Sequence, residues 1–202
     1  MSRDLTVLCI TRGDDYAQRF VARLAQDAAL IDAHLRVETD GAGIESAGYI
    51  ESVLDEAVNR CADGYVLRID DDETLSLALL EWLRAGKYRA ADHWAFARRN
   101  LWPAAGSYVT NPPLWPDLQT RLSVKAKAAS RPEVHQGSPF GTGTVAPAAC
   151  VIDHHKFIAR SRTEREQLVR RYDELAPGAG EAYVMFSMPE LYADDLVVEA
   201  IA

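Results

Sequence analysis

The chain has 202 residues, 48% of them hydrophobic and 26% charged, a composition typical of a globular protein and not of a disordered one. Its formal net charge is −8, whereas nucleic-acid binders usually carry a stripe of basic residues that neutralises phosphates. The negative charge therefore argues against tight binding to duplex DNA. No apolar stretch approaches the roughly 18 to 20 residues of a membrane span, and no signal peptide is evident. We therefore predict a cytoplasmic protein without a transmembrane segment.

The first half of the chain alternates between strand and helix patterns. Apolar runs predict strands at 5–10, 35–38 and 65–69. Apolar residues at helical spacing predict helices that start after Asp14 or Asp15, at 49–61, and at 77–85 with Thr74 or Ser76 as the cap. Three successive strand–helix pairs indicate a doubly wound layer, so the predicted fold class is α/β, with a mostly parallel sheet flanked by helices.

Polar residues follow each of the three predicted strands. They are Thr11-Arg12, Asp40-Gly41 and Asp70-Asp71-Asp72. Right-handed crossovers bring the ends of such strands to one edge of the sheet, where ligands bind in folds of this class. We therefore expect these residues to converge on one crevice.

The run Asp70-Asp71-Asp72-Glu73 is the most informative stretch of the chain, because it follows the apolar residues Tyr65-Val66-Leu67 directly. Four consecutive carboxylates repel one another and resist desolvation. Something positive should meet them, and a divalent cation held by oxygen ligands is the obvious candidate. The alternative is a solvated acidic turn that caps the next helix.

The three cysteines, Cys9, Cys61 and Cys150, are widely spaced and include no CxxC pair. We expect reduced, packed thiols and no zinc site.

The second half of the chain has a different character. Short strands are predicted at 92–98 and 119–124, on either side of a loop at 101–116 that is rich in Trp, Pro and Gly. A second Gly-rich loop, 137–143, is either a lid or a plain surface loop.

A capping box formed by Ser161 and Glu164 predicts a helix with Leu168, Val169 and Tyr172 facing inward. The last twenty or so residues have no firm assignment.

With these residues laid out, the chain resembles the family 2 glycosyltransferases, which have the GT-A fold and use nucleotide-diphosphate sugars. The resemblance covers roughly residues 5–172. Three blocks carry it: the Asp-x-Asp-Glu run 70–73 after two βα units, the Pro-Asp-x-Gln-x-Arg-Leu run 116–122, and Val134-His135 followed by Ile152-Asp153-His154-His155. It implies one GT-A domain, 1–202, with a nucleotide-sugar-binding half, 1–90, and an acceptor and metal-completing half, 91–202.

The resemblance also implies roles for individual residues. Mn²⁺ or Mg²⁺ would be bound by Asp72 directly, by Asp70 directly or through water, and by His135. Asp40 would contact the nucleotide base or ribose, and Asp117 would be the general base. The remaining donor-binding residues are Thr11, Arg12, Asp70, Asp71 and Arg121, of which the arginines suit the phosphates. Further candidates are His154 for the metal or a phosphate, and Trp102 and Trp115 for stacking on a sugar or base.

One departure from the family pattern bears on the base: Pro116 stands where relatives carry the first acid of an acidic pair. If Asp117 takes the acceptor proton, attack comes from the face opposite the leaving group, and the anomeric configuration inverts. Trp94 is expected in the core. Arg98 and Arg99 either contact phosphates or simply end a strand.

The predicted function is therefore metal-dependent, inverting transfer from a nucleotide-diphosphate sugar, with a UDP-sugar as the first choice. The acceptor is undefined: a glycan, a small molecule or modified DNA bases, the last as in some viral glycosyltransferases. A nucleotidyltransferase remains open too, although Thr11-Arg12-Gly13-Asp14 makes a poor phosphate loop. A non-catalytic nucleotide-sugar binder is the last alternative.

Overall fold

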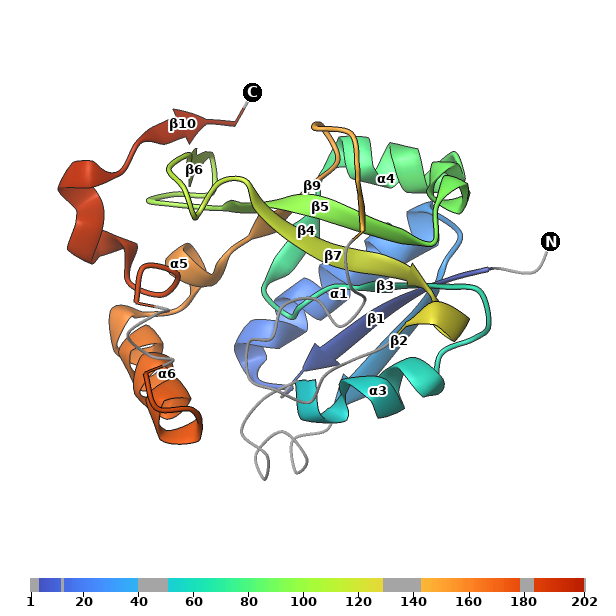
Figure 1. Ribbon diagram of the computed structural model, residues 1–202, viewed down its shortest axis with the longest axis horizontal. Helices are drawn as coiled ribbons and strands as arrows, with labels where there is room; N and C mark the ends of the chain where they lie inside the picture. Colours follow the sequence, from blue (N-terminus) through green and yellow to red (C-terminus); the bar gives the residue numbers. More distant parts are fainter. Residues whose placement is uncertain (1–3, 12, 40–50, 129–142, 179–183, 202) are drawn as a thin grey trace. The chain divides into compact units, whose positions relative to one another are not determined.

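The computed structural model describes residues 4–11, 13–39, 51–128, 143–178 and 184–201 (Figure 1). The helices are α1 (Asp15–Leu30), α3 (Glu51–Asn59), α4 (Leu77–Arg84), α5 (Lys156–Ala159) and α6 (Arg162–Leu175), with short 3₁₀ helices η1 (Lys87–Ala90), η2 (Lys125–Lys127) and η3 (Pro189–Asp195). The strands are β1 (Leu5–Thr11), β2 (His34–Thr39), β3 (Tyr65–Arg68), β4 (Glu73–Leu75), β5 (His93–Asn100), β6 (Ser107–Val109), β7 (Asp117–Val124), β8 (Thr144–Val145), β9 (Val151–His154) and β10 (Val198–Ala200).

The chain divides into two compact units. Unit 1 comprises Met1–Ala97 and Leu118–Ile152, and unit 2 comprises Arg98–Asp117 and Asp153–Ala202. Each unit is treated by itself below.

The large sheet has the strand order β2-β1-β3-β7-β5-β9-β4, with β8 paired to β5. β1 pairs in parallel with both β2 and β3, whereas β7 runs antiparallel to β3. The predicted α/β class, with a central sheet flanked by helices, is confirmed, and the sheet is mixed.

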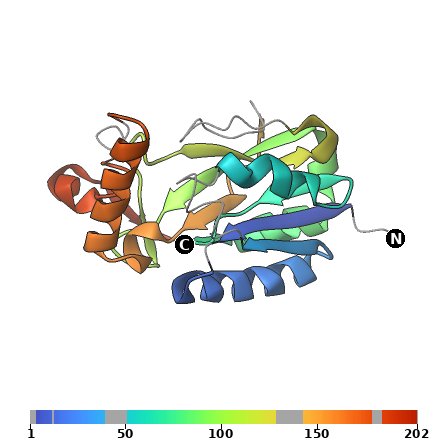
Figure 2. The same ribbon diagram turned by 90° about the horizontal axis from the view of Figure 1, so that it is seen from below.

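The core of unit 1 has two layers because side chains alternate along β1. Val7 and Cys9 belong to a buried cluster with Leu24 of α1, whereas Leu8 and Ile10 belong to a cluster with α3 residues. Accordingly, α1 and α3 lie on opposite faces of the sheet (Figure 2). The two helices therefore cover the two faces of the sheet at β1.

The predicted N-caps of α1 and α4 are confirmed. Asp14 accepts a hydrogen bond from the Ala17 amide at 2.8 Å, and Ser76 accepts one from the Leu79 amide at 3.3 Å. Thr74, the other candidate cap, lies instead in β4, a three-residue strand that had not been expected. The acidic run therefore connects two strands and does not cap α4.

The expected buried features are also present. Trp94 is in the core and its indole N–H donates to the Tyr88 carbonyl oxygen at 2.6 Å. The three cysteines are free and buried, as predicted. None of the helices in the described ranges is long and apolar enough to cross a membrane.

Unit 2 contains the antiparallel pair β6–β10, a small cluster of Val109, Leu114 and Phe157, and the helices α5, α6 and η3. The capping box of α6 is confirmed. The prediction that Leu168, Val169 and Tyr172 face inward is only partly met, because all three are half-buried.

The buried residue of α6 is Arg165, whose guanidinium lies 2.8 Å from Glu190. An arginine can bury its long apolar stem when its head is paired, and this explains why a purely apolar pattern missed it.

Candidate functional site

The acidic run forms a closed turn between β3 and β4. The backbone amide of Asp70 donates to Glu73 Oε2 at 2.9 Å, and the amide of Glu73 donates to the Asp70 carbonyl oxygen at 3.1 Å. Asp70 and Asp71 are half-buried, whereas Asp72 and Glu73 are 8% and 1% exposed. We call residues 70–73 the acidic turn.

Two arginines meet this turn. Arg68 donates through Nε to Asp70 Oδ1 at 3.0 Å. Arg121, at 3% exposure, donates through Nη2 to Asp70 Oδ2 and to Glu73 Oε1, both at 2.7 Å. The repulsion expected among the four carboxylates is therefore offset, in part, by two guanidinium groups.

In the structure, Arg121 has partners that the sequence did not indicate: its Nη2 donates to Asp70 and Glu73. That Arg121 contacts the donor phosphates stays a prediction. Arg68 also pairs with Asp70, through the other carboxylate oxygen. Both arginines thus shape the turn.

The ends of the first three strands meet as expected, as far as they are described. The Thr11 hydroxyl, at the end of β1, donates to Asp71 Oδ2 at 2.9 Å and accepts from the Gly13 amide at 3.0 Å. Thr11 also pairs in register with Thr39, the last residue of β2. Three of the predicted residues, Arg12, Asp40 and His135, lie outside the described residues.

Cys9 is a buried residue of β1, two positions before Thr11. Burial, together with the negative charge of Asp71 and the other acids of the turn, raises the pKa of the Cys9 thiol. The thiol therefore stays protonated and is not a nucleophile at this site.

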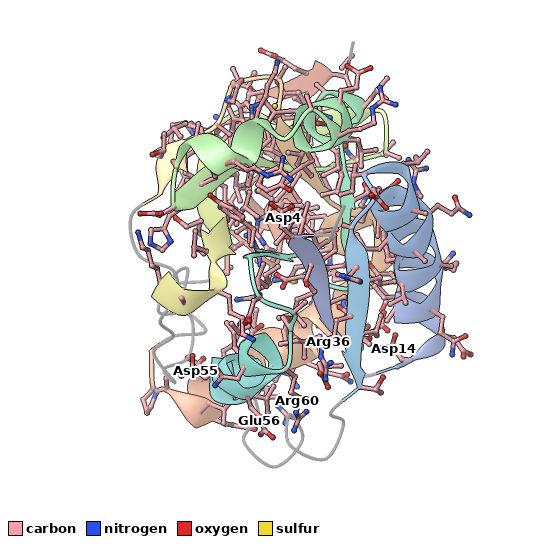
Figure 3. The ribbon with its side chains drawn as sticks, turned by 90° about the vertical axis from the view of Figure 1, so that its right-hand side faces the viewer. Asp4, Asp14, Arg36, Asp55, Glu56 and Arg60 are labelled. Atoms are coloured by element: carbon pink, nitrogen blue, oxygen red, sulfur yellow. The ribbon has the colours of Figure 1, made fainter. Side chains whose placement is uncertain are left out.

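A second charged group in unit 1 lies along β2. Arg36 pairs with Glu38, and Arg60, which follows the last residue of α3, pairs with Glu56 and, at 3.2 Å, with Glu38. Figure 3 shows Arg36, Glu56 and Arg60 close to one another on this side of the unit. These partners satisfy one another at a partly exposed surface, so we assign them to structure.

The acidic turn suits a hard cation in its chemistry, because its ligands are carboxylate oxygens. It does not form a complete metal site from the described residues alone: no group of three or more His, Cys, Asp or Glu side chains among them is arranged to hold an ion. Both oxygens of Asp70 already face guanidinium groups.

Unit 2 holds its own set of polar pairs around the end of β5. Arg98 donates to Asp117 Oδ2 at 2.7 Å, and Arg99 binds both oxygens of Asp153 at 2.7 and 3.0 Å. Asp117, the predicted base, is thus buried in an ion pair. Arg98 and Arg99, predicted either to contact phosphates or to end a strand, lie near the end of β5 and pair with carboxylates.

The third residue at the end of β5 also has a buried partner. Asn100 Nδ2 donates to the Leu114 carbonyl oxygen at 3.0 Å, and Asn100 Oδ1 lies 2.7 Å from His154 Nδ1. Sequence reasoning singled out His154 but missed Asn100. A polar residue directly after two arginines at a strand end was the only available signal.

The predicted aromatic residues of unit 2 differ in their surroundings. Both are half-buried: Trp102 packs against the small apolar cluster, and Trp115 makes an edge contact with Tyr108, with ring centroids 5.1 Å apart. Arg99 lies 5.7 Å from the Tyr108 ring centroid. Stacking of Trp102 and Trp115 on a ligand stays a prediction.

Comparisons with known proteins add little. No protein-family model matches the chain, and no curated protein matches it. Among solved structures 31 chains match. One is the crystal structure of S. aureus TarS 1-349, which is 9% identical, with 94% of this chain and 74% of that chain covered and a TM-score of 0.42. A likeness at this level carries no conclusion about activity.

Proposed function

We propose that the chain is a glycosyltransferase that binds a nucleotide-diphosphate sugar at the acidic turn and transfers the sugar to an acceptor hydroxyl. The observation that carries the proposal is the place of the turn in unit 1. The acidic turn comes just after β3, and Asp71 accepts a hydrogen bond from the Thr11 hydroxyl at the end of β1. Ligands bind at this edge of α/β sheets.

The donor class rests on the motif resemblance: the Asp-x-Asp-Glu run is followed by the Pro-Asp-x-Gln-x-Arg-Leu run in the family order. When bound, Mn²⁺ or Mg²⁺ would supply positive charge to the departing diphosphate. Asp72 is the proposed direct ligand and His135 the second, and Asp70, whose two oxygens face Arg68 and Arg121, would contact the ion through water. A UDP-sugar is the first donor to test.

The arginines have a defined part in this proposal. Arg68 and Arg121 hold Asp70 and Glu73 through ion pairs within unit 1. A turn fixed in advance loses less conformational freedom when the donor binds, and its charges need no reorganisation during transfer. Arg121 therefore supports donor binding by positioning the turn.

The acceptor hydroxyl must also lose its proton. The family resemblance assigns this role to Asp117, with inversion as the stereochemical outcome. A positioned base contributes on the order of 10²- to 10⁴-fold to the rate. Asp117 already receives the guanidinium of Arg98 at 2.7 Å, which offsets part of the negative charge that would attract a proton.

Donor binding is tested by thermal unfolding with UDP-, GDP-, CMP- and dTDP-sugars, each with Mn²⁺, with Mg²⁺ and with neither. We expect about 2.7 kcal/mol of stabilisation by the right donor at about a hundredfold excess over Kd. Asp72→Asn should abolish this effect. Asp63→Asn, which makes the same charge change at a fully exposed acid of unit 1, should not. Absence of stabilisation by every donor under all three ion conditions would contradict the proposal.

An enzyme is distinguished from a binder by donor hydrolysis. Many glycosyl donors are slowly hydrolysed when water replaces the acceptor, so the nucleoside diphosphate should be released with the preferred donor and ion. Asp72→Asn should stop this release, and Asp63→Asn should leave it intact. Tight donor binding without any release, even when acceptors are supplied, would point to a binding protein.

A further inference from the structure

Strand β10 pairs with a single neighbour among the described residues. The small sheet of unit 2 has the strand order β10-β6, and its register runs from Val198 opposite Val109 to Ala200 opposite Ser107. One long edge of β10 is therefore covered by β6, and no described strand covers the other. We call this second edge the outer edge of β10.

The hydrogen bonds to β6 determine which main-chain groups β10 presents on its outer edge. The Val197 carbonyl oxygen accepts from the Thr110 amide, and the Ile201 amide donates to the residue before β6, both at 2.9 Å. An antiparallel strand bonds to one neighbour at every second residue. The N–H and C=O groups of Val198 and Ala200 therefore point away from β6 and lie on the outer edge.

Side chains next to β10 fix the start of the strand. Asn111 Nδ2 donates to the Asp195 carbonyl oxygen at 3.0 Å, and Asn111 Oδ1 accepts from the Val197 amide. The Thr110 hydroxyl donates to the Val197 carbonyl oxygen at 3.2 Å, and the half-buried Leu196 packs against the small apolar cluster. Because these contacts set the course of β10 in advance, a segment that pairs with it meets a strand that has little freedom left to lose.

The side chains of β10 leave its outer edge accessible. All three residues of the strand are exposed. Val197 and Val198, whose side chains point to opposite faces of the sheet, are 55% and 37% exposed. An exposed strand with apolar side chains and an open main-chain edge is a template for pairing with another chain.

The charge around β10 selects the kind of partner. Residues 191–201 contain Asp194, Asp195 and Glu199 and no Lys, Arg or His. All three acids are exposed, and none of them forms an ion pair with a residue that the structure describes. Pairing with a second copy of β10 would bring these acids together, and like charges across a strand pair are destabilising. A basic segment would instead place cations opposite them.

We propose that the outer edge of β10 binds an extended, basic segment of a partner protein, which joins the small sheet as a third strand. This inference does not depend on the proposed glycosyl transfer. The main chain of the segment bonds to Val198 and Ala200. Its Lys or Arg side chains lie on the face of the sheet that carries Glu199, and its apolar side chains lie on the face that carries Val198.

The test uses the full chain and a short synthetic peptide of alternating lysine and valine. Amide hydrogen exchange, followed by nitrogen-15 NMR, should slow about tenfold at Val198 and Ala200 when the peptide is at about tenfold excess over Kd. The Glu199 amide, which faces β6, should change little. A peptide with glutamate in place of lysine should protect neither residue. A fully N-methylated lysine–valine peptide, which keeps its charges but has no N–H donors, should protect neither residue as well.

Variants separate the charge from the main-chain contacts. Glu199→Lys should weaken binding of the lysine–valine peptide about fivefold or more, whereas Glu174→Lys, the same charge change at an exposed acid of α6, should not. Val198→Pro removes an N–H group from the outer edge and should abolish the protection of Ala200, because proline is tolerated at a strand edge that faces solvent.

Three results would overturn the proposal, whether or not Val198→Pro folds. The first is that the lysine–valine peptide protects neither Val198 nor Ala200. The second is that the glutamate or the N-methylated peptide binds as tightly as the lysine–valine peptide. The third is a dimer of the free protein, seen by sedimentation, that Val198→Pro dissociates, because the outer edge would then belong to a second copy of the chain.

Discussion

Arg121→Met tests how the acidic turn is held together. The substitution keeps most of the apolar stem but removes the guanidinium that donates to Asp70 and Glu73 at 2.7 Å. Asp70 retains Arg68, so the main loss is at Glu73, whose side chain is fully buried. Removing one partner of a buried ion pair costs about 3 to 5 kcal/mol, because the remaining charge is left without compensation.

Urea unfolding followed by circular dichroism measures this cost as a drop in the free energy of unfolding. The matched control is Lys127→Met, which breaks the half-exposed pair with Asp92 and should cost at most about 1 kcal/mol. The double variant Arg121→Met/Glu73→Gln should be more stable than Arg121→Met alone, because an amide needs no cation. Equal, small effects of Arg121→Met and Lys127→Met would refute the structural role of Arg121.

Three further substitutions test other parts of the fold. Burial raises the pKa of Asp27 above its usual 3.8, so the free energy of unfolding should fall as the pH rises from 3.8 through the higher pKa of the folded state. Urea unfolding across this pH window should show a smaller fall for Asp27→Asn than for the wild-type protein. Parallel curves of the two proteins would contradict the effect of burial on Asp27. At Gly64, φ is +120° and an added Cβ would collide with the backbone of Asp4. Gly64→Ala should therefore lower the free energy of unfolding, measured by chemical denaturation, by about 1 to 3 kcal/mol. Gly106→Ala, where an added Cβ meets open space, should lower it much less, and equal losses would contradict the collision. Ser161→Ala removes the N-cap of α6 and should cost about 1 kcal/mol of stability in urea melts, and an unchanged midpoint would show that the cap is dispensable.

The first half of the fold was accessible from the sequence because each of its signals is local. A continuous apolar run predicts β1, and capping residues next to helical periodicity predict α1 and α4. All three elements lie where they were predicted. The three-residue strand β4 was missed, since so short a run within an acidic stretch carries no periodicity.

The partners of the charged residues could not be read from the sequence, because they depend on contacts between distant strands. Arg121 is far from the acidic turn along the chain, and only the antiparallel pairing of β7 with β3 brings it there. The bond between Asn100 and His154 likewise joins residues 54 positions apart. Sequence motifs identified residue types suited to a reaction, and the structure assigned their partners.

A crystal structure of the protein with Mn²⁺ and the donor that stabilises it most is the most direct test of the central claim. The account predicts the diphosphate at the ends of β1 and β3, in contact with Asp71 or Asp72 or with an ion bound to them, while Arg121 still holds Glu73. An ordered donor bound elsewhere, with the acidic turn touching neither ion nor diphosphate, would contradict it.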